Sequence, residues 1–326
     1  MRSPKDPFDT PAQILAPVNA LAEVEPLLEA GADWLYGGCL PGEWTERYPA
    51  TVLLNQRTFA SAQFASLDEL EAAVRMARRS GGRFALTLNA PFYMDEQMEL
   101  ALDMAGWAAD VGVGALIVAD PGLMVRVREA GIAVPMHLST MGLGSNAPAV
   151  RLFAELGVTR VILPRFLNLR QVAMLVEQVP EVEYEAFILV GKCPNVEGVC
   201  TFLHDSPDLR WPCEWDWEIS GPCGERAPEA VTLHFKGMRD TDRRDACGLC
   251  ALPALLSGGV NIFKVVGRGA PLDRKVLMVT RLRRLMAGAR EGSGPQWIQG
   301  CMEAYRSLFG HPCSPQNCYY PEALQE

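Results

Sequence analysis

The sequence predicts an α/β fold, a (β/α)8 barrel of the TIM type with a cysteine-rich insertion after the seventh strand. Three observations support this prediction. Apolar strand-like runs alternate with amphipathic helical segments, a glycine ends several of those helices, and the alternation breaks only once. Parallel strands need crossover connections, which the helices supply. An open doubly wound sheet is the alternative, because strand counts from sequence carry an error of one or two.

Glycines mark the junctions between the predicted helices and strands. Glycine tolerates the left-handed conformation that closes a helix, and a buried parallel strand reads as a short apolar run. The junction glycines are Gly31, Gly112, Gly131, Gly157 and Gly259. Read outward from them, strands are expected near 13–18, 33–37, 84–89, 115–119, 133–138, 160–164, 182–190 and 260–266, with helical periodicity in segments such as 67–79 and 149–156.

The alternation breaks between residues 191 and 245. We therefore predict one domain in which 11–192 and 245–290 form the barrel, 193–244 form a cysteine-rich, cluster-binding insertion, and 291–326 form a cysteine-containing cap. An insertion after the seventh strand would lie over the carboxyl-terminal mouth, where barrel active sites are found. Long irregular segments inside compact folds are normally functional or disordered, and the three tryptophans of this one argue against disorder.

Composition and charge suggest an ordinary globular enzyme. The chain has 326 residues, of which 49% are hydrophobic and 21% charged, with a net charge of −9. This acidity disfavours a broad basic surface for nucleic acid, so a small-molecule substrate is expected, although a local basic patch remains compatible with RNA. The polar segment Met1–Thr10 has no secretory signal pattern, and no apolar stretch is long enough to cross a membrane. These features predict a cytoplasmic protein.

Ten cysteines in a reducing compartment indicate metal ligands or redox groups before disulfides. Six of them fall between residues 193 and 250, and four converging thiolates satisfy either an iron–sulfur cluster or structural zinc. Spacing alone does not choose between these metals. The tail offers two further alternatives, a second metal site or a cap over the cluster. No role is assigned to Cys39, Cys301, Cys313 and Cys318.

Several motifs together resemble peptidase family U-32, the collagenase-like family. They include LAPVNALAEVEPLLEAGADWLYGG, LTLNAPFY, GALIVADPGLM, the GKC and GVC pair, and VNIFKVVGR, in the family's order and spacing. The chain is most similar to the branch of oxygen-independent ubiquinone-ring and RNA hydroxylases. It departs from the family at Val266, where an acidic residue is usual, and at Val190, where a histidine is often present.

The resemblance implies a barrel and a 4Fe–4S cluster. It places the first three cluster ligands at Cys193, Cys200 and Cys223 and favours Cys247 as the fourth, with Cys250 or Cys213 as substitutes. It further implies an oxidoreductase that hydroxylates an aromatic or heteroaromatic substrate without dioxygen, with prephenate as the oxygen donor. Two alternatives stay open: a peptidase or other hydrolase, and a non-catalytic iron–sulfur subunit that works with a homologous partner.

Polar residues at the carboxyl ends of the predicted strands are the site candidates. An arginine pair suits a dianionic substrate, and a histidine suits proton transfer near neutral pH. Structural ion pairs of Arg165 and Lys264, and a purely structural His137, are equally compatible with the pattern. Asp120 lies at the same edge. We predict catalytic roles for His137, Arg165, Glu185 and Lys264, and substrate binding by Tyr36, Asn89, Ser139 and Arg268.

Overall fold

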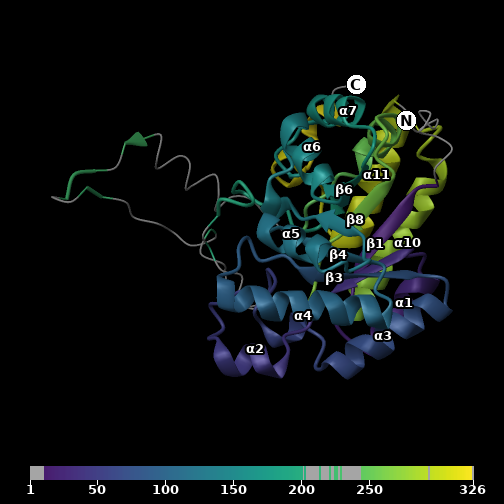
Figure 1. The fold of residues 1–326 in the computed structure, drawn as a ribbon. Coiled ribbons are helices and arrows are strands. Elements are labelled where there is room, and N and C mark those ends of the chain that lie inside the picture. Colours follow the sequence, from purple (N-terminus) through teal and green to yellow (C-terminus); the bar gives the residue numbers. More distant parts are fainter. Residues whose placement is uncertain are drawn as a thin grey trace.

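The chain folds into a closed barrel of eight parallel strands surrounded by helices, as seen in the computed structural model (Figure 1). The strands follow one another around the barrel in chain order, and β8 closes it by pairing with β1. The predicted (β/α)8 architecture is confirmed. The structure describes residues 11–200, 202, 213, 220, 221, 224–226, 228, 229, 244–292 and 294–324.

Seven of the eight observed strands lie within about two residues of their predicted limits. The exception is β5, predicted over 133–138, which begins only at Met136 because Pro135 has no N–H to donate to a ladder. The strands are β1 Gln13–Pro17, β2 Trp34–Gly37, β3 Arg83–Leu88, β4 Ala115–Val118, β5 Met136–Leu138, β6 Val158–Ile162, β7 Glu183–Leu189 and β8 Ile262–Val265.

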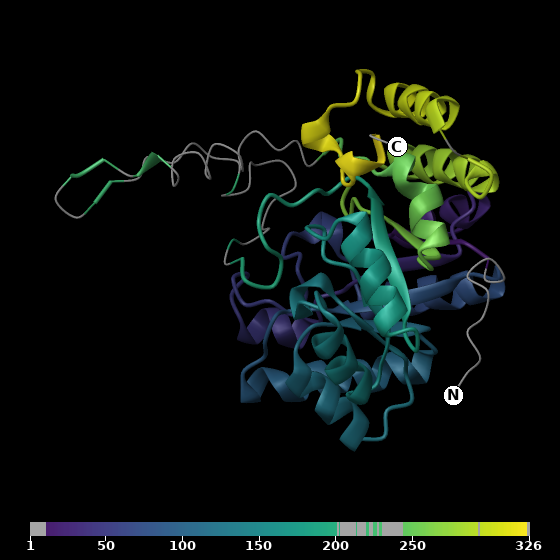
Figure 2. The same cartoon turned by 90° about the horizontal axis from the view of Figure 1, so that it is seen from above.

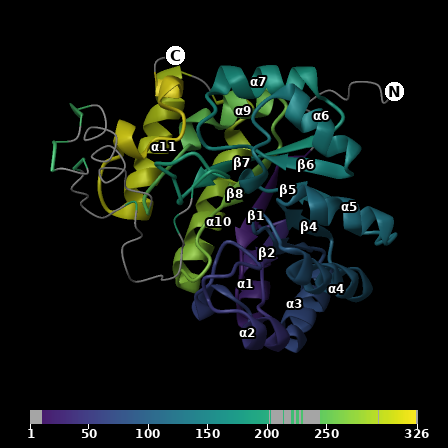
Figure 3. The same ribbon diagram turned by 60° about the vertical axis from the view of Figure 1, so that its left-hand side comes forward.

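Helices surround the barrel on its outside (Figure 3). In α3, for example, Leu70, Ala73, Val74 and Ala77 are buried at helical spacing, and the Ser66 hydroxyl caps the first turn by accepting from the Glu69 N–H at 3.1 Å. The helices are α1 Val24–Glu29, α2 Gly42–Arg47, α3 Leu67–Arg79, α4 Asp95–Val111, α5 Pro121–Glu129, α6 Ala147–Glu155, α7 Leu169–Gln178, α9 Leu252–Ser257, α10 Leu272–Gly288 and α11 Gly294–Phe309.

All five predicted junction glycines have a positive φ, between 68° and 107°. Residues with a Cβ resist this conformation, which explains why glycine stands at each helix-to-strand junction. These junctions set where each strand starts. They therefore also set which residues reach the carboxyl-terminal mouth.

A charged network fills the barrel interior. The carboxylate of Glu185 is fully buried and accepts from Lys264 Nζ at 2.9 Å and from Arg160 Nη1 at 3.5 Å. Arg160 also binds Glu183 at 2.9 Å and lies over the Trp34 ring. Buried charges need such partners, because removing them from water is costly.

The carboxyl-terminal segment packs against the barrel beside β7 and β8. Short 3-10 turns at η5 (Leu249–Ala251), η6 (Pro315–Asn317) and η7 (Pro321–Leu324) lie together with α11 (Figure 2). Tyr319 and Tyr320 are buried there. Whether residues 193–244 form a separate cluster-binding insertion stays a prediction, because most of them lie outside the described residues. In the part of the chain that the structure describes, no helix is long and apolar enough to cross a membrane.

Candidate active site

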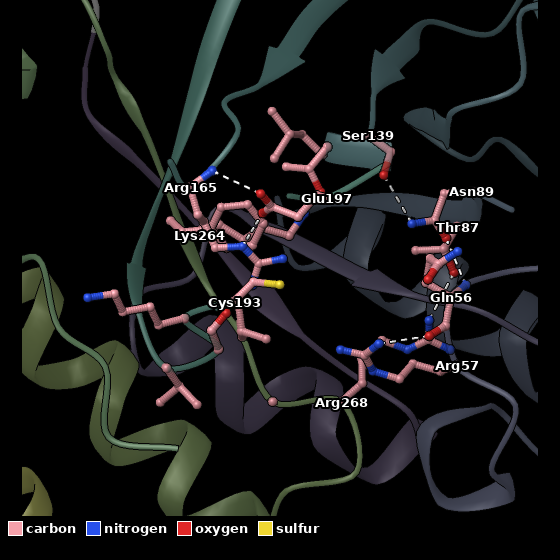
Figure 4. A pocket seen from close by; sticks show the side chains of 18 of the residues that line it. Gln56, Arg57, Thr87, Asn89, Ser139, Arg165, Cys193, Glu197, Lys264 and Arg268 are labelled. Carbon is pink, nitrogen blue, oxygen red and sulfur yellow. Dashed lines mark hydrogen bonds and ion pairs between the residues drawn. The ribbon is translucent and has the colours of Figure 1, made fainter. Parts of the chain in front are cut away.

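A cavity of about 410 Å³ opens at the carboxyl ends of the strands. Six of the eight predicted catalytic and binding residues line it, whereas His137 and Glu185 do not. Figure 4 shows Arg165, Glu197, Lys264 and Cys193 on one side of the cavity and Arg57, Arg268 and Asn89 on the other. The predicted residues that line it are Tyr36, Asn89, Ser139, Arg165, Lys264 and Arg268.

The cavity is strongly cationic although the whole chain is acidic. Among the described lining residues, Glu197 is the sole carboxylate, whereas seven side chains are lysine or arginine. Such a wall concentrates anions even on a protein of net negative charge, since the field inside a cleft depends on nearby charges. The cations are Arg57, Arg165, Lys192, Arg244, Lys264, Arg268 and Arg274.

Arg268 is held by neutral oxygens on all sides. It donates to the Ala62 carbonyl at 2.8 Å, to Gln63 Oε1 at 2.8 Å, to Asn55 Oδ1 at 3.1 Å and to Thr87 Oγ1 at 3.2 Å. Burial lowers the pKa of Arg268 to about 9, and neighbouring Arg57 adds to the shift. The guanidinium stays protonated at neutral pH, and none of these acceptors cancels its charge. Arg268 is thus a rigid cation suited to a bound anion.

Arg165 forms the structural ion pair that was one of its two predicted roles. Its side chain binds the Glu197 carboxylate and the Gly191 carbonyl, and it lies 4.2 Å above the Phe187 ring. Burial alone would lower the pKa of Arg165, but the Glu197 carboxylate raises it above its ordinary value. Arg165 therefore fixes the loop after β7 to the barrel mouth.

Lys264 forms part of the cavity floor. Its ammonium binds Glu185 and lies 4.2 Å from the centroid of the Tyr36 ring, a cation–π contact. Burial lowers the pKa of Lys264, while Glu185 opposes that shift. Glu185 thus acts through Lys264 and does not itself reach the cavity.

His137 lies inside the barrel, away from the cavity lining. Its ring is 2% exposed, packs 5.4 Å from the Trp34 ring, and has no hydrogen-bond partner at Nδ1. Burial and the nearby Arg160 and Lys264 cations lower its pKa well below the ordinary value. His137 is not among the described residues that line the cavity, and its catalytic role stays a prediction.

Two polar residues on the opposite wall hold each other in place. Asn89 Nδ2 donates to Ser139 Oγ at 3.2 Å, and Asn89 Oδ1 accepts from the Gln56 N–H at 3.2 Å. Asp120 instead caps α5 by accepting from the Leu123 N–H at 3.1 Å and is not among the described residues that line the cavity.

The turn after β7 is strained and directs the first cysteines to the mouth. Val190 has a φ of 64° and Gly191 a φ of 81°. A left-handed conformation is unfavourable for a β-branched residue, and such strain concentrates at functional sites. The Val190 N–H is held by the Ala246 carbonyl at 2.7 Å. The turn brings Lys192 and Cys193 into the cavity wall.

Three cysteines, Cys193, Cys200 and Cys213, line this cavity. Burial raises the pKa of Cys193, while the Arg165 cation lowers it. Cys223 lies outside the described residues, and Cys247 lines a different cavity. These three thiols are the kind of donor that an iron–sulfur cluster needs. Among the described residues, however, no three histidine, cysteine or carboxylate side chains are grouped closely enough to hold a metal ion. The predicted four-cysteine set stays a prediction.

The chain belongs to Peptidase family U32, whose model matches residues 19–323. It is 28% identical to the tRNA hydroxylation protein P of Escherichia coli over 64% of this chain and 44% of that protein. It is 27% identical to the Escherichia coli 23S rRNA 5-hydroxycytidine C2501 synthase over 70% of this chain and 34% of that protein. It is also 26% identical to the collagenase of Porphyromonas gingivalis over 78% of this chain and 61% of that protein. The chain thus spans less than half the length of either RNA-modifying relative.

These relatives correct one expectation from the sequence. A small aromatic substrate was favoured over nucleic acid because of the net charge of −9. The relatives named for tRNA and 23S rRNA contradict that preference. Net charge misled because it averages over the whole surface, whereas the cations gather in the cavity at the barrel mouth.

Several site residues were missed by sequence reasoning. Arg57 lies in an irregular stretch before α3, where no periodicity marks it. Glu197 stands between Cys193 and Cys200 in the motif that was read only for its cysteines. An acidic residue there, close to a predicted mouth arginine, was the available signal for an ion pair.

Proposed function

We propose that this chain is an RNA-base hydroxylase whose target base enters the cavity at the barrel mouth. The observation that carries the proposal is the excess of cations over carboxylates around a cavity of about 410 Å³. Phosphates would bind near the rim, and an enzyme that acts on a base must take it out of its stack. The names of the RNA-modifying relatives support the substrate class.

In this proposal Cys193, Cys200 and Cys223 hold an iron–sulfur cluster, and the fourth ligand is Cys213, the alternative to Cys247 that lines the same cavity. When bound, the cluster supplies one-electron redox chemistry. The oxygen comes from a donor other than dioxygen, and the family resemblance implies prephenate. Arg268 binds an anionic group of the donor or the RNA, and Lys264 holds a proton at the cavity floor.

The test compares RNA from a strain lacking this gene with RNA from the same strain carrying it. Digested nucleosides are analysed by mass spectrometry. We expect one nucleoside that is heavier by one oxygen atom to disappear in the deletion strain and to return with the wild-type gene, but not with Cys193→Ser. Identical nucleoside profiles in both strains would refute the proposal.

A second assay separates the hydroxylase from the family's peptidase members. Purified, oxygen-free protein is incubated with gelatin and, separately, with RNA from the deletion strain plus prephenate. Modification of the RNA without gelatin cleavage is the expected result. Gelatin cleavage by the wild type that is lost in Arg268→Met would favour the peptidase alternative over the hydroxylase.

A further inference from the structure

A second cavity, separate from the cationic one, is lined by five cysteines. These residues come from three separate segments: the stretch that leads into η5, the helix α11, and the tail around η6. No charged side chain is found among the described residues around this cavity. The five are Cys247, Cys250, Cys301, Cys313 and Cys318, and we call them the thiol cluster.

Backbone hydrogen bonds fix the three segments to one another. The Cys247 N–H donates to the Asn317 carbonyl at 2.9 Å, and the Tyr319 N–H donates to the Cys247 carbonyl at 2.9 Å. From α11, Trp297 Nε1 donates to the Cys250 carbonyl at 3.1 Å. Figure 2 shows the tail folded back over this part of the chain. Hydrogen bonds to main-chain groups therefore hold the three cysteine-bearing segments together.

The thiols interact with one another and with backbone donors. Cys250 and Cys301 share a thiol hydrogen bond. The Leu249 N–H donates to Cys247 Sγ at 3.4 Å.

Ordinary core packing does not account for the thiol cluster. A single buried cysteine behaves as a small hydrophobic residue, but such residues pack without voids. Here all five are free thiols around an unfilled space of about 20 Å³. That space is about the size of one water molecule or one metal ion.

We propose that the thiol cluster binds a metal centre through cysteine thiolates, separate from the cavity at the barrel mouth. Cys250, Cys301, Cys313 and Cys318 supply four donors, and Cys247 is a fifth. Thiolates select zinc or iron, and binding of a divalent ion replaces four thiol protons, which pass to solvent. Nothing in this proposal depends on the RNA-hydroxylase function.

Metal binding must draw the sulfurs inward. Among the described residues, no three histidine, cysteine or carboxylate side chains are already grouped so that they could hold an ion. The sulfurs instead stand around the cavity. A zinc ion requires sulfurs about 2.3 Å from the metal, whereas an iron–sulfur cluster binds sulfurs that stand farther apart.

The experiment uses the full chain purified without oxygen and measures zinc, iron and acid-labile sulfide per chain. We compare the wild type with Cys313→Ser/Cys318→Ser and with Cys193→Ser/Cys200→Ser. The tail variant should lose one complete metal centre that the mouth variant keeps. Zinc without sulfide identifies a single ion, and iron with sulfide identifies a cluster. Equal metal content in the wild type and the tail variant would overturn the proposal.

A second measurement covers the case in which the tail variant does not fold. Wild-type protein is alkylated with iodoacetamide before and after treatment with a chelator, and modified cysteines are mapped by mass spectrometry. Cys313 and Cys318 are partly exposed, so they should be protected before chelation and modified afterwards. Equal modification in both samples would also overturn the proposal.

Discussion

The cavity at the barrel mouth and the thiol cluster place the same residue type in opposite surroundings. At the mouth, Cys193 lies near the Arg165 cation in a cavity of about 410 Å³. In the thiol cluster, five cysteines surround about 20 Å³ with no charged side chain among their described neighbours. Fixed cations at the mouth favour bound anions, whereas no charged side chain is found among the described residues that line the thiol cluster, so a bound metal cation would be what stabilises its thiolates. The charges around a cysteine therefore decide whether its thiolate form is stabilised.

The largest expected effect is a loss of stability when the buried ion pairs of Glu185, below the cavity, are broken. Glu185→Leu leaves Arg160 and Lys264 buried without their shared carboxylate, and removing one partner of a buried pair costs about 3–5 kcal/mol. We expect the free energy of unfolding in urea to fall by that amount. Glu183→Gln is the matched control, because the Glu183 side chain is 55% exposed and its pair is worth about 1 kcal/mol or less. Equal losses in both variants would mean that the interior network does not support the mouth.

The second prediction concerns the rigid cation of the mouth. Arg268→Met removes the cation that would bind the anion, and it also leaves the Asn55 and Gln63 side-chain oxygens without this donor. A charged hydrogen bond contributes about 1.5–3 kcal/mol, so RNA hydroxylation should fall about 10- to 100-fold. Metal content of the thiol cluster should not change. Arg268→Lys should recover only part of the activity, because lysine lacks the planar fork that meets several acceptors. Full activity in Arg268→Met would remove this residue from the site.

Much of this architecture, but less of the site, was predictable from sequence. The glycine junctions and apolar runs located all eight strands because helix ends and buried parallel strands have local sequence signatures. The lining residues at strand ends, such as Tyr36 and Arg268, followed from the barrel geometry. The glycine at position 38 also reflects the folded structure. A Cβ there would lie only 3.0 Å from Arg268 Nη2.

The sequence did not predict the contacts between residues that lie far apart along the chain. Cys247 stands near the other cysteines of the 193–250 segment in sequence, yet its backbone pairs with residues 317 and 319 of the tail. His137 ends a strand as expected, but the direction of its side chain places it inside the barrel. Both depend on long-range packing, for which one sequence carries no local signal.

The third prediction uses the buried imidazole of His137. Its pKa is well below 6.5, so below pH 6.5 the unfolded chain takes up a proton that the folded chain does not. Stability must then fall as the pH decreases, by about 1.4 kcal/mol per pH unit until the folded-state pKa is reached. Urea unfolding from pH 7 to pH 5 measures this slope. His137→Gln should flatten it, whereas an unchanged slope would assign the pH dependence to other groups.

The smallest effect is expected at Lys192, the residue that joins the two regions. Lys192 lines the mouth cavity, and its Nζ donates to the carbonyls of Gln316 and Cys318, each at 2.7 Å. Lys192→Met removes both bonds to the tail, and because the side chain is partly exposed the cost should be about 1 kcal/mol.

We expect faster amide hydrogen exchange at residues 313–320 and an unchanged exchange rate in β1–β4. Lys192→Arg, which keeps the charge and the donors, serves as the control. If exchange in the tail is unaltered by Lys192→Met, the tail is held by the Cys247 backbone pairing alone. The two regions would then be mechanically independent, and loss of metal from the thiol cluster should leave RNA hydroxylation at the mouth intact.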